Sequence, residues 1–257
     1  MKYELYSHRY GLEIIRGDKE AKEVFEKLEE IIQNISEEEI LKNFLKRRRD
    51  DKKNDKSISI ILNETLRNKL LENGWEKEVY IFKDKNYSDA ENRSKNKAWR
   101  LDFAYPGLFS LEVAFNHSSA ALVNLMKPVL ASEINHVQKA LDGDKRTKFG
   151  ILITAKSALQ ANGGFDGAIG TYEKYIKQLK PHMNFLITPT VIIGLEGLEN
   201  YLVEKVTNTK TRKVSTIVKK KVANSVEYEV IYDSRQSDNT VPQNSSESLD
   251  QNTRSDL

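Results

Sequence analysis

The chain has 257 residues, no cysteine and a net charge of +3. This length fits one good-sized domain with an ordinary buried core, and the absence of cysteine excludes a disulfide framework, a zinc–thiolate site and a thiol nucleophile. No apolar run approaches the length of a membrane span, and the opening MKYELYSHRY lacks the basic-then-apolar layout of a signal peptide. Composition therefore favours a soluble, cytoplasmic protein, and any binding of nucleic acid must depend on where the charges lie.

Two helices are predicted in the first third of the chain. Apolar side chains recur at the spacing of one helical face over residues 19–35, and Asp18 is placed to cap that helix. A second helix is expected over residues 64–73, started by Asn63 and ended by Gly74.

A polar, basic loop is expected between these helices, over residues 46–57. Its arginines Arg47, Arg48 and Arg49 can neutralise phosphates and release counterions. We expect them to contact phosphates rather than bases, because a flexible run of like charge positions a partner without discriminating its sequence. A solvated linker is the alternative, since aspartates interrupt the positive charge in this segment.

The stretch Trp99–Asn116, WRLDFAYPGLFSLEVAFN, predicts a β-hairpin with its turn at Pro106-Gly107. Because side chains alternate between faces, the apolar set packs into the core while Asp102 and Glu112 project from the other face, close together across the ladder. A divalent cation relieves the repulsion between two carboxylates, and Mg²⁺ suits them because it needs few protein ligands and keeps waters for chemistry. The alternative is a half-exposed hairpin whose polar face meets solvent.

Helices and inner strands are expected after the hairpin. Ser118 or Ser119 can cap a helix through AALVNLMK, which Pro128 kinks or ends before Ser132 caps a further helix to Leu141.

The apolar segments 149–154 and 185–194 are predicted as inner strands of a mixed sheet, with a Gly-rich loop at 162–167 and a helix over 171–180 between them. A β-arm is expected over 214–218 and 226–232. This alternation predicts an α/β domain whose central mixed sheet is flanked by helices.

Three blocks of sequence occur together in an order that is similar to one known family. LYSHRYGLEII (Leu5–Ile15) and LNETLRNKLLENGWEKE (Leu62–Glu78) precede LEVAFNHSSAALVNLMK (Leu111–Lys127), and together they span roughly the first half of the chain. They resemble the BamHI/BglII/BstYI group of type II restriction endonucleases, in the PD-(D/E)XK nuclease superfamily. In that group Glu-x-Glu or Glu-x-Gln is followed by an Asn/Ser-rich loop and a helix.

The resemblance implies an Mg²⁺ site built from Asp102, Glu112 and the main-chain carbonyl of Val113. It also implies an assisting acidic side chain after the second predicted helix, for which Glu78 is the first choice and Glu76 the second. The residues expected close to the DNA are Asn116, His117, Ser118 and Ser119.

The resemblance further implies a PD-(D/E)XK restriction-endonuclease-like fold and a homodimer, to whose interface the helical region after the hairpin contributes. Such an enzyme cleaves double-stranded DNA at a short palindrome, here expected to be centred on GATC, and leaves 5′-phosphates. A cognate DNA methyltransferase would be its functional partner. Residues 1–205 would form the catalytic and dimerisation domain, 206–233 a basic C-terminal arm, and 234–257 a disordered tail.

Ala114 departs from the family pattern, since this group carries Glu or Gln there and the wider superfamily carries Lys. A methyl group can neither bind a metal nor accept a proton from water. Three explanations are open: a neighbour such as His117 or Asn116 substitutes, metal-bound water with the substrate phosphate suffices, or the chain is a weakened or inactive form. Two other functions therefore compete, a structure-specific repair or junction nuclease of the same fold and a catalytically weakened DNA-binding protein.

Overall fold

The computed structural model describes residues 1–50, 55–82, 99–133, 146–209, 211–212, 214–223 and 225–237. Within these ranges six strands form a central sheet in the order β1-β6-β5-β4-β3-β2, and three form a second sheet in the order β7-β8-β9. The central strands are β1 (Tyr3–His8), β2 (Glu76–Tyr80), β3 (Arg100–Tyr105), β4 (Phe109–Val113), β5 (Phe149–Ala155) and β6 (Thr190–Leu195). The others are β7 (Tyr201–Thr207), β8 (Val214–Lys221) and β9 (Tyr228–Asp233).

The helices bracket the central sheet. They are α1 (Gly11–Gly17), α2 (Lys19–Gln33), α3 (Glu37–Arg49), α4 (Ser59–Glu72), α6 (Ala121–Ser132), α7 (Ser157–Asn162), α8 (Tyr172–Leu179) and α9 (Ser234–Ser237), with short 3₁₀ turns η2 (Ser118–Ala120) and η4 (Lys180–His182). No described helix combines the length and apolar character that crossing a membrane requires.

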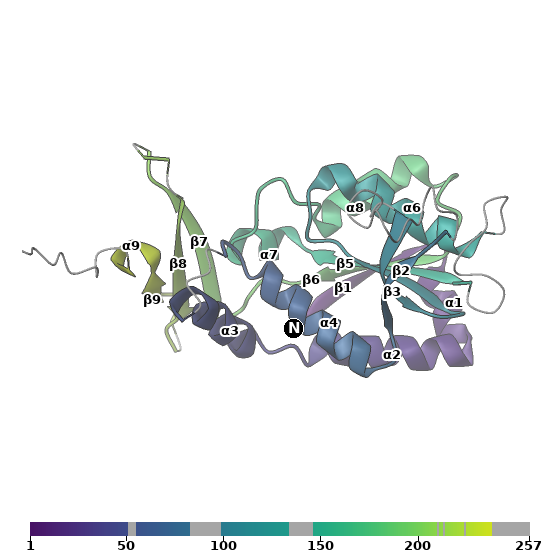
Figure 1. The fold of residues 1–257 in the computed structure, drawn as a ribbon, viewed down its shortest axis with the longest axis horizontal. Helices are drawn as coiled ribbons and strands as arrows, with labels where there is room; N and C mark the ends of the chain where they lie inside the picture. The colour runs from purple at the N-terminus through teal and green to yellow at the C-terminus, as the bar shows by residue number, and fades with distance from the viewer. Residues whose placement is uncertain are drawn as a thin grey trace, which may run out of the picture.

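The central sheet is mixed and covered on both faces, which confirms the predicted fold class. β4, β5 and β6 run parallel, whereas β1, β3 and β2 join by antiparallel pairing. Alternate residues of β5 enter different cores: Ile151 and Ile153 pack in the core that includes α2 and α4, while Leu152 packs in the core that includes α6 and α8. The two helix pairs accordingly lie on opposite sides of the sheet (Figure 1).

The first two predicted helices are present, although one begins earlier than expected. Asp18 caps α2 by accepting a hydrogen bond from the Ala21 N–H at 2.9 Å. α4 begins at Ser59, so the predicted start at Asn63 is wrong, because the buried residues Ile61 and Leu62 draw an earlier turn into the helix. Its predicted end is confirmed: Gly74 follows the helix in the left-handed region, at φ +83.

The basic segment is helical up to Arg49, which corrects the predicted loop from residue 46. Ser36 caps α3, and Ile40 and Phe44 bury one face of it. Glutamates occupy its first turn and Lys46–Arg49 its last, an arrangement that complements the helix dipole. Residues 51–54 of the expected loop lie outside the described residues.

α6 continues through Pro128 to Ser132, so of the two outcomes expected at Pro128, a kink or an end, the end is wrong. Ser132 is the last residue of α6 rather than a new cap, and residues 134–145, where a further helix was expected, lie outside the described residues. The Pro128 ring packs on β5 at Gly150, where an added Cβ would stand 2.7 Å from Pro128 Cβ. Gly150 thereby lets α6 settle directly on the sheet.

The predicted β-arm is confirmed as β8 and β9, but β7 belongs to it as well. β7 spans residues 201–207, so the boundary expected after residue 205 falls inside a strand. The small sheet lies beyond α3 and α7, away from the central sheet (Figure 1). Residues 234–237 form α9, and the rest of the tail expected to be disordered lies outside the described residues.

We expect Gly150→Ala to lower the free energy of unfolding by about 1–3 kcal/mol, because the added Cβ would stand 2.6 Å from Thr190 Oγ1 and 2.7 Å from Pro128 Cβ, so that the Thr190 side chain and α6 must both move. Gly167→Ala is the matched control, since nothing lies within 4 Å of a Cβ built there. Urea unfolding of both variants measures the effect. Equal stability of the two variants would contradict the close seating of α6.

Candidate active site

The hairpin of β3 and β4 forms as predicted. Its turn contains Pro106 followed by Gly107 at φ +81, and the Leu108 N–H donates to the Tyr105 carbonyl at 3.0 Å. Pro and then a residue with positive φ are the signature of a type II turn.

Beyond the Phe103–Leu111 pair the backbone ladder between β3 and β4 stops, and two carboxylates take its place. The Val113 N–H donates to Asp102 Oδ2 at 2.9 Å, and the Asp102 N–H donates to Glu112 Oε1 at 3.2 Å. Each carboxylate is thus held by the backbone of the opposite strand. The predicted closeness of Asp102 and Glu112 is confirmed.

Glu112 is buried, and Asp102 is half-buried. Glu112 is 2% exposed, since α6 packs over β4. Burial, followed by the charge of Asp102, raises the pKa of Glu112 to about 8. Burial also raises the pKa of Asp102, although the Val113 N–H opposes the shift. The alternative of a polar face that meets solvent is therefore wrong for Glu112.

A cation that the sequence analysis overlooked completes this cluster. Lys127 Nζ lies 2.5 Å from Glu112 Oε2, and its side chain is 9% exposed. Lys127 lies on α6, whose mostly apolar sequence predicts a helix packed in a core or an interface rather than one that contributes to a site. The available signal was the spacing of Asn124 and Lys127, which puts two polar side chains on one side of an otherwise apolar helix.

Further buried polar groups border the carboxylates. Asn124 Nδ2 donates to the Tyr175 hydroxyl at 2.9 Å and to Asn116 Oδ1 at 3.4 Å. Burial raises the pKa of Tyr175 to about 12, and the charges of Glu112 and Asp102 add to the shift. α6 and α8 therefore supply a polar lining on the side of the sheet where Glu112 is buried.

Glu78 lies across from Asp102 on the neighbouring strand. The β2–β3 register leaves Glu78 unpaired between two paired residues, with φ +54, a left-handed conformation that is uncommon outside glycine. Glu78 Oε2 lies 3.5 Å from Arg100 Nη1, and the charge of Glu78 contributes to the raised pKa of Asp102. Glu76, the second choice, pairs further along with Ala104 and is exposed.

Comparison with known proteins gives the family. Residues 3–195 match the family of restriction endonucleases BglII/BglIII. The chain belongs to this family. Among solved structures it is similar to restriction endonuclease BglII complexed with a DNA 16-mer, with 16% sequence identity and a TM-score of 0.55 over 90% of this chain and 99% of that chain. Free BglII is similar over the same shares at 15% identity, with a TM-score of 0.48.

No curated protein sequence matches significantly. The family match identifies the chain as a type II restriction endonuclease, that is, a site-specific deoxyribonuclease. The fold similarity to BglII agrees with the restriction-endonuclease-like fold that the sequence resemblance implied.

In this restriction endonuclease the predicted DNA-contacting residues lie in the turn between β4 and α6. The turn is tied to the loop before α8, because the Gly170 N–H donates to the Asn116 carbonyl at 3.0 Å and the Ser118 N–H donates to the Ala168 carbonyl at 2.8 Å. Asn116 and Ser119 are exposed, and Ser118 is partly exposed. The Asn/Ser-rich turn and the Gly-rich loop thus form one surface.

His117 is exposed on this surface, and its backbone pairs with Ile169. Its charge acts on Asp166, whose pKa is lowered mainly by the Ala168 N–H and in part by His117. Among the described residues, the main electrostatic influences on Asp102 and Glu112 do not include His117. A part for His117 in activating water stays a prediction.

The three arginines at the end of α3 contact other parts of the chain. Arg47 pairs with Asp55 at 2.7 Å and with Glu64 at 3.2 Å. The Arg48 and Arg49 guanidinium groups lie over the Tyr232 ring of β9, and Arg49 also donates to the Ile231 carbonyl at 2.9 Å. They link α3 to the small sheet, and their contact with phosphates stays a prediction.

The site suits a metal that needs few protein ligands. No cluster of three or more His, Cys, Asp or Glu side chains that could hold a metal occurs within the described ranges. Asp102 and Glu112 nevertheless offer two neighbouring carboxyl groups, one half-buried and one buried, whose like charges stay together only with a proton or a cation. Mg²⁺ commonly binds through one or two carboxylates and completes its shell with water and phosphate oxygens, so the residues fit it.

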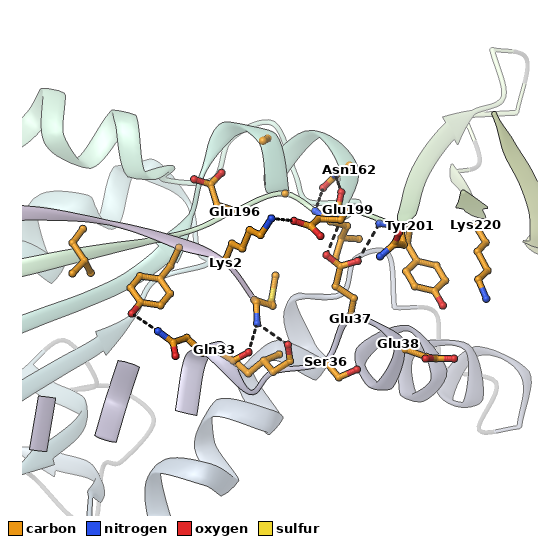
Figure 2. Close-up of a pocket in the computed structure, with 18 residues that line it drawn as sticks. Lys2, Gln33, Ser36, Glu37, Glu38, Asn162, Glu196, Glu199, Tyr201 and Lys220 are labelled. Carbon is orange, nitrogen blue, oxygen red and sulfur yellow. Dashed lines mark hydrogen bonds and ion pairs between the residues drawn. The ribbon is translucent and has the colours of Figure 1, made fainter. Parts of the chain in front are cut away.

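A cavity of about 1390 Å³ lies elsewhere, near the start of β1 and the junction with β7 (Figure 2). Its charged groups already have partners: Lys2 pairs with Glu199 at 2.5 Å, and Glu37 accepts hydrogen bonds from the N–H groups of Glu199 and Asn200. The Met1 ammonium donates to three carbonyls at the end of α2 and just beyond it. These contacts join structural elements and offer no catalytic group.

In the metal-free protein we expect the free energy of unfolding to fall as the pH rises from about 5 to about 8. Glu112 has a pKa of about 8 when folded, against an ordinary value of 4.5, so the folded chain holds a proton that the unfolded chain has released. The contribution of Glu112 to the free energy of unfolding is therefore fully present below pH 4.5 and is lost as the pH rises toward 8. Glu112→Gln should make the free energy of unfolding less dependent on pH over this range.

Urea unfolding with a chelator at several pH values measures this dependence in the natural chain and in the variant. All other titrating groups are common to both proteins, so the difference between the profiles reports Glu112. Parallel profiles would show that the Glu112 pKa is not raised.

Proposed function

We propose that this restriction endonuclease hydrolyses both strands of DNA at a short palindrome centred on GATC, uses Mg²⁺, and leaves 5′-phosphates. The observation that carries the proposal is the carboxylate pair at the end of the β3–β4 ladder, where Asp102 and the buried Glu112 are each held by the opposite strand. The similarity to BglII, solved as a complex with a DNA 16-mer, supports DNA as the substrate.

We assign Asp102, Glu112 and the main-chain carbonyl of Val113 to the metal, with Glu78 assisting from β2. Mg²⁺, when bound, would polarise the scissile phosphate and lower the pKa of a water molecule. The chain's own contribution is orientation, because the Val113 and Asp102 N–H groups restrain the two carboxylates. α6 covers Glu112 and excludes bulk water, which strengthens electrostatic interactions at the site.

DNA is proposed to lie over the joined surface of the β4–α6 turn and the Gly-rich loop, with Asn116, His117, Ser118 and Ser119 closest to it. Their position directly after the carboxylate strand supports this assignment. Arg47, Arg48 and Arg49 are proposed as phosphate contacts from the last turn of α3, where each also makes contacts within the chain.

A homodimer is proposed because a palindrome offers two equal half-sites to a twofold assembly. Within α6, Leu125 and Val129 are buried in the chain's own core, whereas Leu122 and Val123 are each 38% exposed. The exposed pair is the part of this helix available to a second copy. A DNA methyltransferase that modifies the same site is the expected functional partner.

Asp102→Asn and Glu112→Gln should each abolish cleavage, because each removes a charged metal ligand from the proposed site. Asp102→Asn keeps the oxygen that accepts from the Val113 N–H, so its free energy of unfolding should change by less than about 2 kcal/mol. In Glu112→Gln one oxygen cannot accept from both the Asp102 N–H and the Lys127 ammonium, so the loss of stability should be larger. Plasmid digestion with Mg²⁺ and urea unfolding measure the two properties. Cleavage retained by either variant would remove the metal-site assignment.

Digestion of plasmid DNA by the natural chain should give discrete fragments with four-base 5′ overhangs from GATC-centred sites. Sequencing the fragment ends reads the site and the cut position together. Blunt ends or an asymmetric site would contradict the proposed specificity. Smeared products or a preference for branched DNA would indicate a structure-specific nuclease, and binding without cuts would indicate a DNA-binding protein that has lost catalysis.

A further inference from the structure

The buried contact between Lys127 and Glu112 needs an explanation beyond stability. Both side chains are almost fully covered, with Nζ and Oε2 at 2.5 Å. Taking an ammonium and a carboxyl group out of water carries a desolvation penalty that their mutual contact often fails to offset, so such pairs are weak sources of stability. α6 otherwise buries mainly apolar side chains, and an apolar residue at position 127 would pack there without that penalty.

The same part of the site lacks a group on β4. Ala114 is two residues after Glu112, and its N–H continues the pairing with β5 by donating to the Ile153 carbonyl at 2.8 Å. Side chains two residues apart in a strand point to the same face, so the Ala114 methyl faces the layer of α6. Ala114 is buried in the core that contains Leu125 and Val129 of that helix. A small side chain here leaves space that a long side chain from α6 can enter.

The Lys127 side chain extends from α6 to Glu112, two residues before Ala114 in the chain. Its charge also acts on Asp102. An ammonium has three N–H donors, and the contact with Glu112 uses one of them. The remaining donors are available to oxygen atoms brought to the two carboxylates.

We propose that Lys127 is a catalytic residue of this endonuclease, whose ammonium contacts the scissile phosphate and the attacking water in place of the side chain missing at Ala114. This rests on the proposed function. In the reaction a water oxygen bonds to phosphorus and the bond from phosphorus to the 3′ oxygen breaks. The water releases one proton to solvent, and the 3′ oxygen takes one from solvent. The Lys127 ammonium stabilises the negative charge that develops on the phosphate.

Lys127 fits this role better than His117. Lys127 touches Glu112 directly, whereas His117 lies on the exposed turn and acts on Asp166. The helix that carries Lys127 is also fixed to the sheet where Pro128 packs on Gly150, which limits the movement of its neighbour in the chain.

The test compares Lys127→Met, the double variant Lys127→Met with Ala114→Lys, and Lys156→Met. Lys127→Met should lower the single-turnover cleavage rate with Mg²⁺ by about 10²–10³-fold, the usual loss when one stabilising donor is removed. The double variant should recover at least about tenfold of that loss, because it returns an ammonium to the same face of the sheet.

Lys156→Met is the matched control. Lys156 is also a partly buried lysine, and it pairs with Glu4 and Glu196. It follows the last residue of β5, whereas α6 packs on β5 near its start, at Gly150. Its loss should change stability without changing the cleavage rate.

Calcium binding by calorimetry, without DNA, separates catalysis from construction of the site. Lys127→Met should bind Ca²⁺ no more weakly than the natural chain. The Lys127 ammonium repels the doubly charged Ca²⁺ more strongly than it repels the proton that competes for the same carboxylates, so its removal favours Ca²⁺ binding. A structural role would instead weaken Ca²⁺ binding and lower the urea midpoint together, and that result would overturn the inference.

Cleavage by Lys127→Met at a rate within about threefold of the natural chain would also overturn the inference while leaving the proposed nuclease function intact. Absence of any cleavage by the natural chain with Mg²⁺ would instead contradict the proposed function itself. If Lys127→Met does not fold, Lys127→Arg keeps the charge but moves the donors, and its unchanged cleavage rate with normal folding would count equally against a positioned ammonium.

Discussion

The site depends on one local interruption of the sheet, where the ladder between β3 and β4 ends and carboxylates replace backbone partners. Asp102 and Glu112 each accept a hydrogen bond from the neighbouring strand, which fixes two like charges at close range. Burial under α6 then makes their repulsion costly to maintain without a cation or a proton. A feature that is unfavourable for folding is, for the same reason, favourable for binding a metal.

α6 connects the fold to this chemistry. Its seat on β5 is possible because Gly150 has no side chain, so the Pro128 ring can lie directly against the strand. From that seat Asn124 joins the Tyr175 hydroxyl, and Lys127 reaches Glu112. The helix therefore acts both as one wall of the core and as a source of polar groups for the site.

The sequence predicts best those features that local chemistry decides. The hairpin follows from alternating side chains and from Pro106-Gly107, and the end of α4 follows from Gly74. The basic segment was harder to predict, because Arg48 and Arg49 gain partners on β9, more than 180 residues away in the chain. No local pattern contains that contact.

Long-range packing also explains the incomplete prediction of the site. Asp102 and Glu112 lie on one hairpin, so their spacing was enough to bring them together. Lys127 reaches Glu112 only through the docking of α6, and the position of Glu78 opposite Asp102 depends on the register of β2. The family resemblance implied Glu78 but not Lys127, because the family pattern has its third site residue on the strand, at position 114, and not on a helix.

The central claim is that the Asp102–Glu112 pair holds the catalytic metal. A crystal structure of the protein with cognate DNA and Mn²⁺, located by its anomalous scattering, tests this claim most directly. We expect the anomalous peak of Mn²⁺ at bonding distance from oxygens of both carboxylates and of a DNA phosphate. A peak elsewhere on the DNA, with Asp102 and Glu112 binding no metal, would contradict it.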